Sequence, residues 1–246
     1  MATAPVLLIT GGSRGLGAAT ARLAAKRGFD VAVNYRSDAG AAEKVVAEVK
    51  AAGRRAVAIQ ADVAQELEVE TLFETVDATL GRLTHFVYSS GITGPVSRVE
   101  SLADKDIQQV LAVNVAGAFY CTRAAIKRMS QKHGGQGGSI VLLSSMASVL
   151  GGGGEYVLYA ASKGAIDSMT VGLAREVAGE GIRVNAVSPG LIDTEIQPPG
   201  RVERVGPTVP IGRAGRAEEV AEAILYLLSD AASYVAGTIL RVSGGR

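Results

Sequence analysis

Short apolar runs rich in β-branched residues alternate with longer segments of helical period from one end of the chain to the other. The strand candidates are residues 6–10, 31–35, 56–60, 85–88, 139–144, 183–187 and 238–242. Between them, apolar residues recur every three or four positions, as an amphipathic helix requires. This alternation is typical of a parallel sheet covered by helices on both faces, so we predict an α/β fold.

Length and composition favour one domain. The 246 residues are 48% hydrophobic and 20% charged, which is ordinary for a globular protein, and no proline- or serine-rich linker divides them. A chain of this length buries roughly three quarters of the surface that its unfolded state exposes, so it forms a core without disulfides or metal ions. We therefore expect a single domain over residues 1–246.

Charge and cysteine content argue against several classes of function. The formal net charge is +1 and the basic residues are scattered, so we expect no nucleic-acid partner. Cys121 is the only cysteine, which rules out an intrachain disulfide and favours a reducing, cytoplasmic location. We find no signal peptide and no run of about 18 apolar residues, and expect no membrane partner. His85 and His133 lack metal-ligand spacing, so we expect no metal site.

A glycine-rich turn follows the first predicted strand. Its sequence is T-G-G-S-R-G-L-G over residues 10–17, and a helical stretch follows. Glycines let the backbone turn sharply and approach a pyrophosphate, while the free N–H groups of the helix favour negative charge. The spacing differs from the strict G-x-G-x-x-G fingerprint, because three residues separate Gly11 from Gly15 and one separates Gly15 from Gly17. The alternative is a glycine-rich turn without a ligand.

The end of the second predicted strand indicates which dinucleotide binds. A carboxylate there would accept a hydrogen bond from the ribose of NAD, whereas a cation would pair with the 2′-phosphate of NADP. Arg36 occupies this place, and Arg14 and Ser13 come from the first turn. We therefore favour NADP(H), the alternative being that both arginines are solvated surface residues.

Two side chains of acid–base character stand four residues apart at the start of a later helix. This spacing puts Tyr159 and Lys163 on one helix face, where the ammonium can lower the pKa of the phenol. A free tyrosine, with a pKa near 10, is a poor proton donor or acceptor at neutral pH. Ser144 and Ser145 end the fifth predicted strand, and Asn114 lies in a helix upstream. Strand ends of this kind are where open α/β sheets bind ligands.

These features together resemble the short-chain dehydrogenase/reductase family over nearly the whole chain. The matching segments are residues 10–17, Asp62-Val63, residues 114–117, Ser145, residues 159–163, Pro189-Gly190 and Thr194. The resemblance implies one Rossmann-like, doubly wound domain with a seven-stranded parallel sheet, usually assembled as a homotetramer. It also implies the roles of four residues: Tyr159 is the general acid/base, Ser145 polarises the substrate oxygen, Lys163 binds the nicotinamide ribose and tunes Tyr159, and Asn114 holds a water that connects Lys163 to solvent.

The same reasoning assigns a larger set of residues to the cofactor. They are Gly11, Ser13, Arg14, Gly15, Leu16, Gly17, Arg36, Asp62, Val63, Gly91, Tyr159, Lys163, Pro189, Gly190, Ile192 and Thr194. Asp62 can accept a hydrogen bond from the adenine amino group; its alternative role is to cap the helix expected to begin near residue 64.

The chain departs from the family pattern in two places. Residues 88–91 read Tyr-Ser-Ser-Gly where the family usually has Asn-Asn-Ala-Gly, so the cofactor geometry is open to change. The interval from Ser145 to Tyr159 is one residue longer than usual, and the glycine run at 151–154 can absorb the insertion. Ser144 is the less favoured substitute for Ser145. Residues 191–214 lie where the family places its substrate-binding segment, and they form a candidate lid.

The predicted function is transfer of a hydride between NADP(H) and a carbonyl or secondary alcohol of a small molecule. The ending Val-Ser-Gly-Gly at residues 242–245 adds to a likeness with 3-oxoacyl-carrier-protein reductases and sugar dehydrogenases. A 3-oxoacyl thioester is the first choice of substrate. Alternatives are a sugar or polyol dehydrogenase and a non-catalytic NADP(H) sensor. A carrier-protein partner would call for a basic patch, for which Arg123, Lys127 and Arg128 are candidates.

Overall fold

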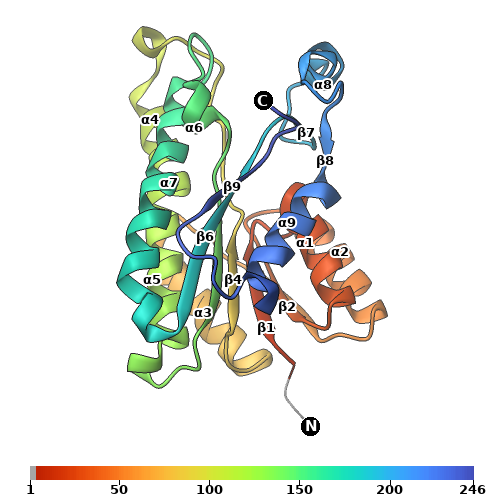
Figure 1. Ribbon diagram of the computed structural model, residues 1–246, viewed down its shortest axis with the longest axis vertical. Helices are drawn as coiled ribbons and strands as arrows, with labels where there is room; N and C mark the ends of the chain where they lie inside the picture. Colours follow the sequence, from red (N-terminus) through yellow and green to blue (C-terminus); the bar gives the residue numbers. More distant parts are fainter. Residues whose placement is uncertain (1–3) are drawn as a thin grey trace.

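A computed structural model describes residues 4–246, and across this range the chain forms a seven-stranded parallel sheet in the order β3-β2-β1-β4-β5-β6-β9 (Figure 1). The strands are β1 (Val6–Thr10), β2 (Asp30–Tyr35), β3 (Ala56–Gln60), β4 (His85–Tyr88), β5 (Gly138–Leu143), β6 (Ile182–Pro189) and β9 (Ile239–Val242). Each lies within two residues of its predicted bounds. The predicted Rossmann-like sheet is therefore confirmed.

The central strands are buried on both faces, which explains their continuous apolar sequences. All five residues of β1 are buried, and Leu8 pairs with Ala32 of β2 on one side and Phe86 of β4 on the other. The chain runs from β1 to the sheet edge at β3 and returns to β4 on the opposite side of β1. This reversal opens a crevice at the carboxyl ends of β1 and β4, where doubly wound sheets bind ligands.

Helices cover both faces of the sheet (Figure 1). One layer consists of α1 (Gly15–Lys26), α2 (Ala39–Ala51) and α9 (Ala217–Leu228). The other layer consists of α3 (Glu66–Thr79), α5 (Gly117–Met129) and α7 (Val157–Val177). Each layer buries its own apolar cluster against the shared sheet. The faces follow the three- and four-residue spacing of the sequence, as in α3, where Val69, Leu72, Phe73 and Val76 are buried.

Shorter elements surround the crevice. They are α4 (Asp104–Leu111), α6 (Ala147–Leu150), α8 (Arg201–Val205), and the short strands β7 (Ile192–Asp193) and β8 (Gly215–Arg216), which pair in parallel. Single turns of 3₁₀ helix occur at Val99–Ser101, Gln131–His133, Ala178–Glu180, Gly206–Thr208 and Asp230–Ala232. A π-helical segment, Ala112–Ala116, joins α4 to α5. Asn114, expected in an ordinary helix, therefore lies in a widened turn, which is often a functional feature.

No helix within residues 4–246 has both the length and the apolar character needed to cross a membrane.

Candidate active site

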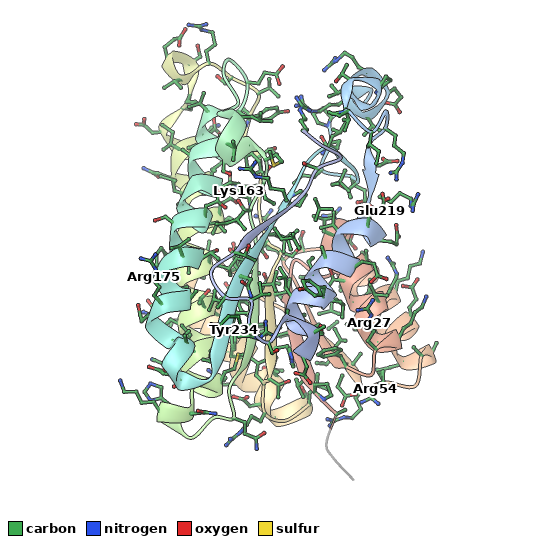
Figure 2. The ribbon with its side chains drawn as sticks, viewed as in Figure 1. Arg27, Arg54, Lys163, Arg175, Glu219 and Tyr234 are labelled. Atoms are coloured by element: carbon green, nitrogen blue, oxygen red, sulfur yellow. The ribbon has the colours of Figure 1, made fainter. Side chains whose placement is uncertain are left out.

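A cavity of about 880 Å³ lies where the carboxyl ends of the central strands meet. Residues that follow β1, β2, β3, β4, β5 and β6 all contribute to its wall. The side chain of Lys163 points from α7 toward the middle of the molecule, whereas Arg175, further along the same helix, points outward (Figure 2). The cavity therefore lies at the crevice that the strand order creates.

The glycine-rich turn packs tightly between β2 and the segment after β4. Gly11 has a φ of +59°, and a Cβ there would lie 3.1 Å from the Ser89 carbonyl oxygen. A Cβ on Gly17 would collide with the Gly11 carbonyl. Asn34 holds the turn from the side, because its Oδ1 accepts a hydrogen bond from the Gly11 N–H at 3.3 Å. The turn leads directly into α1 and leaves the first N–H groups of that helix beside the cavity.

Two guanidinium groups lie at the end of the cavity beside β2. Arg14 and Arg36 both line the wall and both are exposed, and the half-buried Ser13 lines it too. Arg14 Nη1 lies 4.0 Å from Asp38 Oδ2. The other carboxylate oxygen, Asp38 Oδ1, accepts a hydrogen bond from the Ala41 N–H at 2.9 Å and so caps α2. The structure thus brings together the three residues predicted to recognise the 2′-phosphate.

Asp62 lines the cavity and also shapes the turn after β3. Its Oδ1 accepts a hydrogen bond from the Ala64 N–H at 3.0 Å, and Glu68 Oε2 accepts one from the Asp62 N–H at 2.7 Å. Helix α3 begins only at Glu66, after the N-cap Gln65. The carboxylate therefore stabilises the turn that leads into the helix instead of capping the helix itself.

The predicted acid–base residues converge on the same cavity. Ser145, Tyr159 and Lys163 all line it. The Lys163 ammonium lies 5.7 Å from the centre of the Tyr159 ring and donates a hydrogen bond to the Leu143 carbonyl at 2.6 Å. Ser144 is buried, and its Oγ approaches the Lys163 carbonyl at 3.4 Å. Ser144 therefore faces α7, and Ser145 is the serine placed beside the phenol.

Burial controls the protonation of both titrating groups. It raises the pKa of Tyr159 above its usual value, and a hydrogen bond with Ser145 opposes this shift. It also lowers the pKa of Lys163 to about 8, against the opposing charge of Asp167. From the sequence we expected Lys163 to lower the pKa of Tyr159. In the structure the pKa of Tyr159 is raised instead, because desolvation of the phenol is the larger effect and the Lys163 ammonium bonds to the Leu143 carbonyl. The Tyr159 phenol is therefore neutral around neutral pH.

Asn114 uses its side chain to connect two walls of the site. Oδ1 accepts a hydrogen bond from the Ile92 N–H, and Nδ2 donates to the Ile92 carbonyl and to Ser162 Oγ, each at 2.9 Å. Ser162 Oγ in turn donates to the Tyr159 carbonyl at 2.7 Å. Asn114 is buried and does not line the cavity, whereas its neighbour Val113 does. The sequence did not identify Ser162 or Ile92 as parts of this network.

The other predicted cofactor residues lie in the wall, with one exception. Gly11, Gly15, Leu16, Val63, Gly91, Pro189, Gly190, Ile192 and Thr194 line the cavity. Gly17 lies outside the lining and serves the close packing of the turn. Gly91 lies close to the acid–base residues, because a Cβ there would be 3.4 Å from Lys163 Nζ and 3.5 Å from Asn114 Oδ1.

Two segments for which the sequence predicted no regular structure also line the cavity: residues 152–156 and residues 194–201. Arg201, at the start of α8, donates a hydrogen bond to Glu155 at 3.2 Å, and its guanidinium lies 5.2 Å from the centre of the Tyr156 ring. The lining also includes apolar side chains such as Leu150, Ile196 and Pro198, next to the polar Glu195 and Gln197. Arg201 was not predicted as a site residue, because nothing in the sequence signals a pairing across 46 positions.

Comparison with known proteins agrees with this geometry. The family model described as enoyl-(acyl carrier protein) reductase matches residues 11–246. The chain is 50% identical to the uncharacterized oxidoreductase YgfF of Escherichia coli, over 98% of this chain and 99% of that protein. It is 38% identical to a 3-oxoacyl-[acyl-carrier-protein] reductase of Synechocystis, over 99% and 97%. A short-chain dehydrogenase of Burkholderia cenocepacia, solved with NADP, superposes with a TM-score of 0.92 at 36% identity, covering 99% of this chain and 98% of its own.

The fold and the arrangement of the site define an oxidoreductase that acts on CH–OH and C=O groups. The chain belongs to the short-chain dehydrogenase/reductase family, which confirms the resemblance seen in its sequence.

Proposed function

We propose that this protein uses NADP(H) to interconvert a small carbonyl compound and its secondary alcohol. The observation that carries the proposal is the convergence of Ser145, a neutral Tyr159 and Lys163 on the cavity that the glycine-rich turn opens into. The Burkholderia relative holds NADP. Two cationic side chains, Arg14 and Arg36, line the end of the cavity where a 2′-phosphate would lie.

The bound nicotinamide would supply or accept the hydride, and the protein supplies placement and acid–base chemistry. Hydride addition to a carbonyl carbon builds negative charge on the oxygen. The Ser145 hydroxyl can donate a hydrogen bond to that oxygen, and the Tyr159 hydroxyl can transfer its proton to it. Lys163, with a pKa of about 8, is suited to hold the ribose and to help return a proton to Tyr159. Alcohol oxidation uses the same groups in reverse.

Within this class we propose a 3-oxoacyl thioester as the substrate. Apolar side chains in the wall, such as Leu150, Ile196 and Pro198, suit an acyl chain. The Synechocystis relative is named for this reaction on a carrier protein. In this chain, however, Arg123 pairs with Glu66 and Arg128 pairs with Asp77, so the candidate basic patch is largely neutralised. A thioester of a small thiol is therefore preferred over an acidic carrier protein.

The remaining expectations are part of the same proposal. Two helix clusters on one shared sheet support a single domain over residues 1–246. The exposed apolar side chains include Leu111, Phe119, Tyr226 and Tyr234. The homotetramer is proposed from the family resemblance, and sedimentation analysis tests it. A cytoplasmic location is proposed because the chain has a single cysteine, Cys121, which is buried.

The experiment that tests the function follows NADPH absorbance with 3-oxoacyl thioesters, diketones, aldoses and quinones. Tyr159→Phe is measured in parallel, with Tyr120→Phe as the matched control, and every active substrate is repeated with NADH. We expect turnover with NADPH that falls by about 10²–10⁴ in Tyr159→Phe only. Tight NADPH binding without turnover on any substrate would favour the sensor alternative. Failure to bind NADPH would overturn the proposal.

A further inference from the structure

Tyr88 stands where the family pattern has asparagine, and it is completely buried at the end of β4. Its ring lies at an angle to that of Phe86, with 6.4 Å between ring centres, and its hydroxyl donates a hydrogen bond to the Val113 carbonyl. Burial raises the pKa of Tyr88 well above its usual value, so the hydroxyl remains a neutral donor. Unlike Tyr159, this tyrosine is outside the cavity lining.

The acceptor carbonyl belongs to the π-helical segment between α4 and α5. In this segment the Gly117 N–H bonds to the Ala112 carbonyl, five residues earlier. The Tyr88 hydroxyl approaches the widened turn closely, because a Cβ on Gly117 would lie 2.7 Å from Tyr88 Oη and 2.8 Å from the Val63 carbonyl oxygen. The tyrosine and the glycine therefore fit one another, and the bond fixes the turn from the sheet side.

Asn114 is the next residue after Val113. Its side chain bonds to Ile92 after β4 and to Ser162 in α7, and Ser162 bonds to the Tyr159 carbonyl. A shift of the π-helical segment would displace this amide relative to both partners. The hydroxyl of Tyr88 is thus three hydrogen bonds from the backbone of the proton donor.

We propose that Tyr88 is a positioning residue for the proton-transfer machinery, in the place of the family asparagine. Its hydroxyl holds residues 112–116 in the π-helical register that lets Asn114 connect Ile92 with Ser162. The inference rests on the proposed function, because it assigns Tyr88 an effect on catalysis through Asn114.

The test is Tyr88→Phe, which removes the hydroxyl and keeps the ring. We expect kcat for carbonyl reduction to fall on the order of tenfold, because small displacements of reacting groups are costly, while KM for NADPH changes little. Hydrogen exchange at the amides of residues 112–117 should quicken. Tyr120 lies on α5 and packs against the same core, so Tyr120→Phe is the control. It should leave kcat and the hydrogen exchange of residues 112–117 unchanged.

A double mutant shows whether the effect passes through Asn114. In an Asn114→Ala background, Tyr88→Phe should lower kcat less than twofold further, since coupled residues are not additive. A full tenfold loss in that background would overturn the inference. So would a wild-type kcat in Tyr88→Phe, even with a lower melting temperature, because Tyr88 would then be an ordinary core residue. Absence of turnover by the wild-type protein would overturn the proposed function and this inference with it.

Gly117→Ala tests the same contact from the other side should Tyr88→Phe fail to fold. The new methyl group would crowd Tyr88 Oη and the Val63 carbonyl oxygen and displace the segment, so kcat should again fall on the order of tenfold. An unchanged kcat together with unchanged exchange at residues 112–117 would overturn the inference.

Discussion

The Lys163 ammonium donates a hydrogen bond to the main-chain carbonyl of Leu143 at 2.6 Å. Leu143 is the last residue of β5, and Lys163 lies one helical turn after Tyr159 in α7. The bond therefore connects the strand that leads to Ser145 with the helix that carries the phenol. It also keeps a cation in a desolvated place, where the charged form is disfavoured.

The pH dependence of reduction should report Lys163. Burial lowers its pKa from 10.5 to about 8, so the group is charged below about pH 8 and loses its charge above it. The pKa of Tyr159 is raised, so the phenol stays protonated through this range. We expect kcat/KM for NADPH, which reports the free enzyme, to fall as pH rises through about 8.

Lys163→Arg is the control for that assignment. A guanidinium stays charged throughout the accessible pH range, so the residual activity should lose the decline near pH 8. A decline that persists at the same pH in Lys163→Arg would mean that another group is responsible.

The two adjacent serines provide a matched pair of variants. Both serines line the cavity, but only Ser145 hydrogen-bonds with Tyr159, whereas Ser144 is buried and its Oγ approaches the Lys163 carbonyl. Ser145→Ala should lower kcat by about 10²–10³, the effect of losing one donor to a developing oxyanion. Ser144→Ala should change kcat only a few-fold. Steady-state kinetics with saturating NADPH compare kcat of the two variants. Equal losses of kcat would contradict the assignment of Ser145 as the donor to the substrate oxygen.

Arg36 should set the preference between the two nicotinamide cofactors. Because the side chain is exposed, its ion pair with a 2′-phosphate is partly screened, and Arg36→Ala should raise KM for NADPH about tenfold. KM for NADH should be nearly unchanged. Arg175→Ala, on the outward side of α7, controls for the loss of surface charge (Figure 2). Equal changes in KM for both cofactors would argue against contact with the phosphate.

Much of the fold could be predicted because the deciding signals are local. Strands such as β1 and β4 have the bounds that their apolar runs indicate, since strands buried on both faces need continuous apolar sequence. The positions of Ser145, Tyr159 and Lys163 followed from strand ends and helix spacing. These features are determined by periodicity and by the sheet edge at which ligands bind.

The unpredicted features depend on contacts between distant residues. The π-helical segment around Asn114 is held by bonds to Ile92 and Tyr88, which are 22 and 25 residues from their partners. The raised pKa of Tyr159 results from burial in the folded site. The pairing of β7 with β8 involves two residues on each strand, too few for a periodic signal.

Arg201 should govern substrate binding more than chemistry. Its contacts with Glu155 and Tyr156 join α8 to the segment before α7, and all three residues line the cavity. Arg201→Ala should therefore raise KM for the carbonyl substrate several-fold, with smaller changes in kcat and in KM for NADPH, since the cost is that of a partly exposed ion pair and a cation–π contact, about 0.5 kcal/mol each. Arg204→Ala, an exposed residue of the same helix, is the matched control. Glu155→Gln should reproduce part of the effect and add little to Arg201→Ala, because the two side chains act as a pair. A loss confined to kcat would show instead that Arg201 acts on the hydride or proton step.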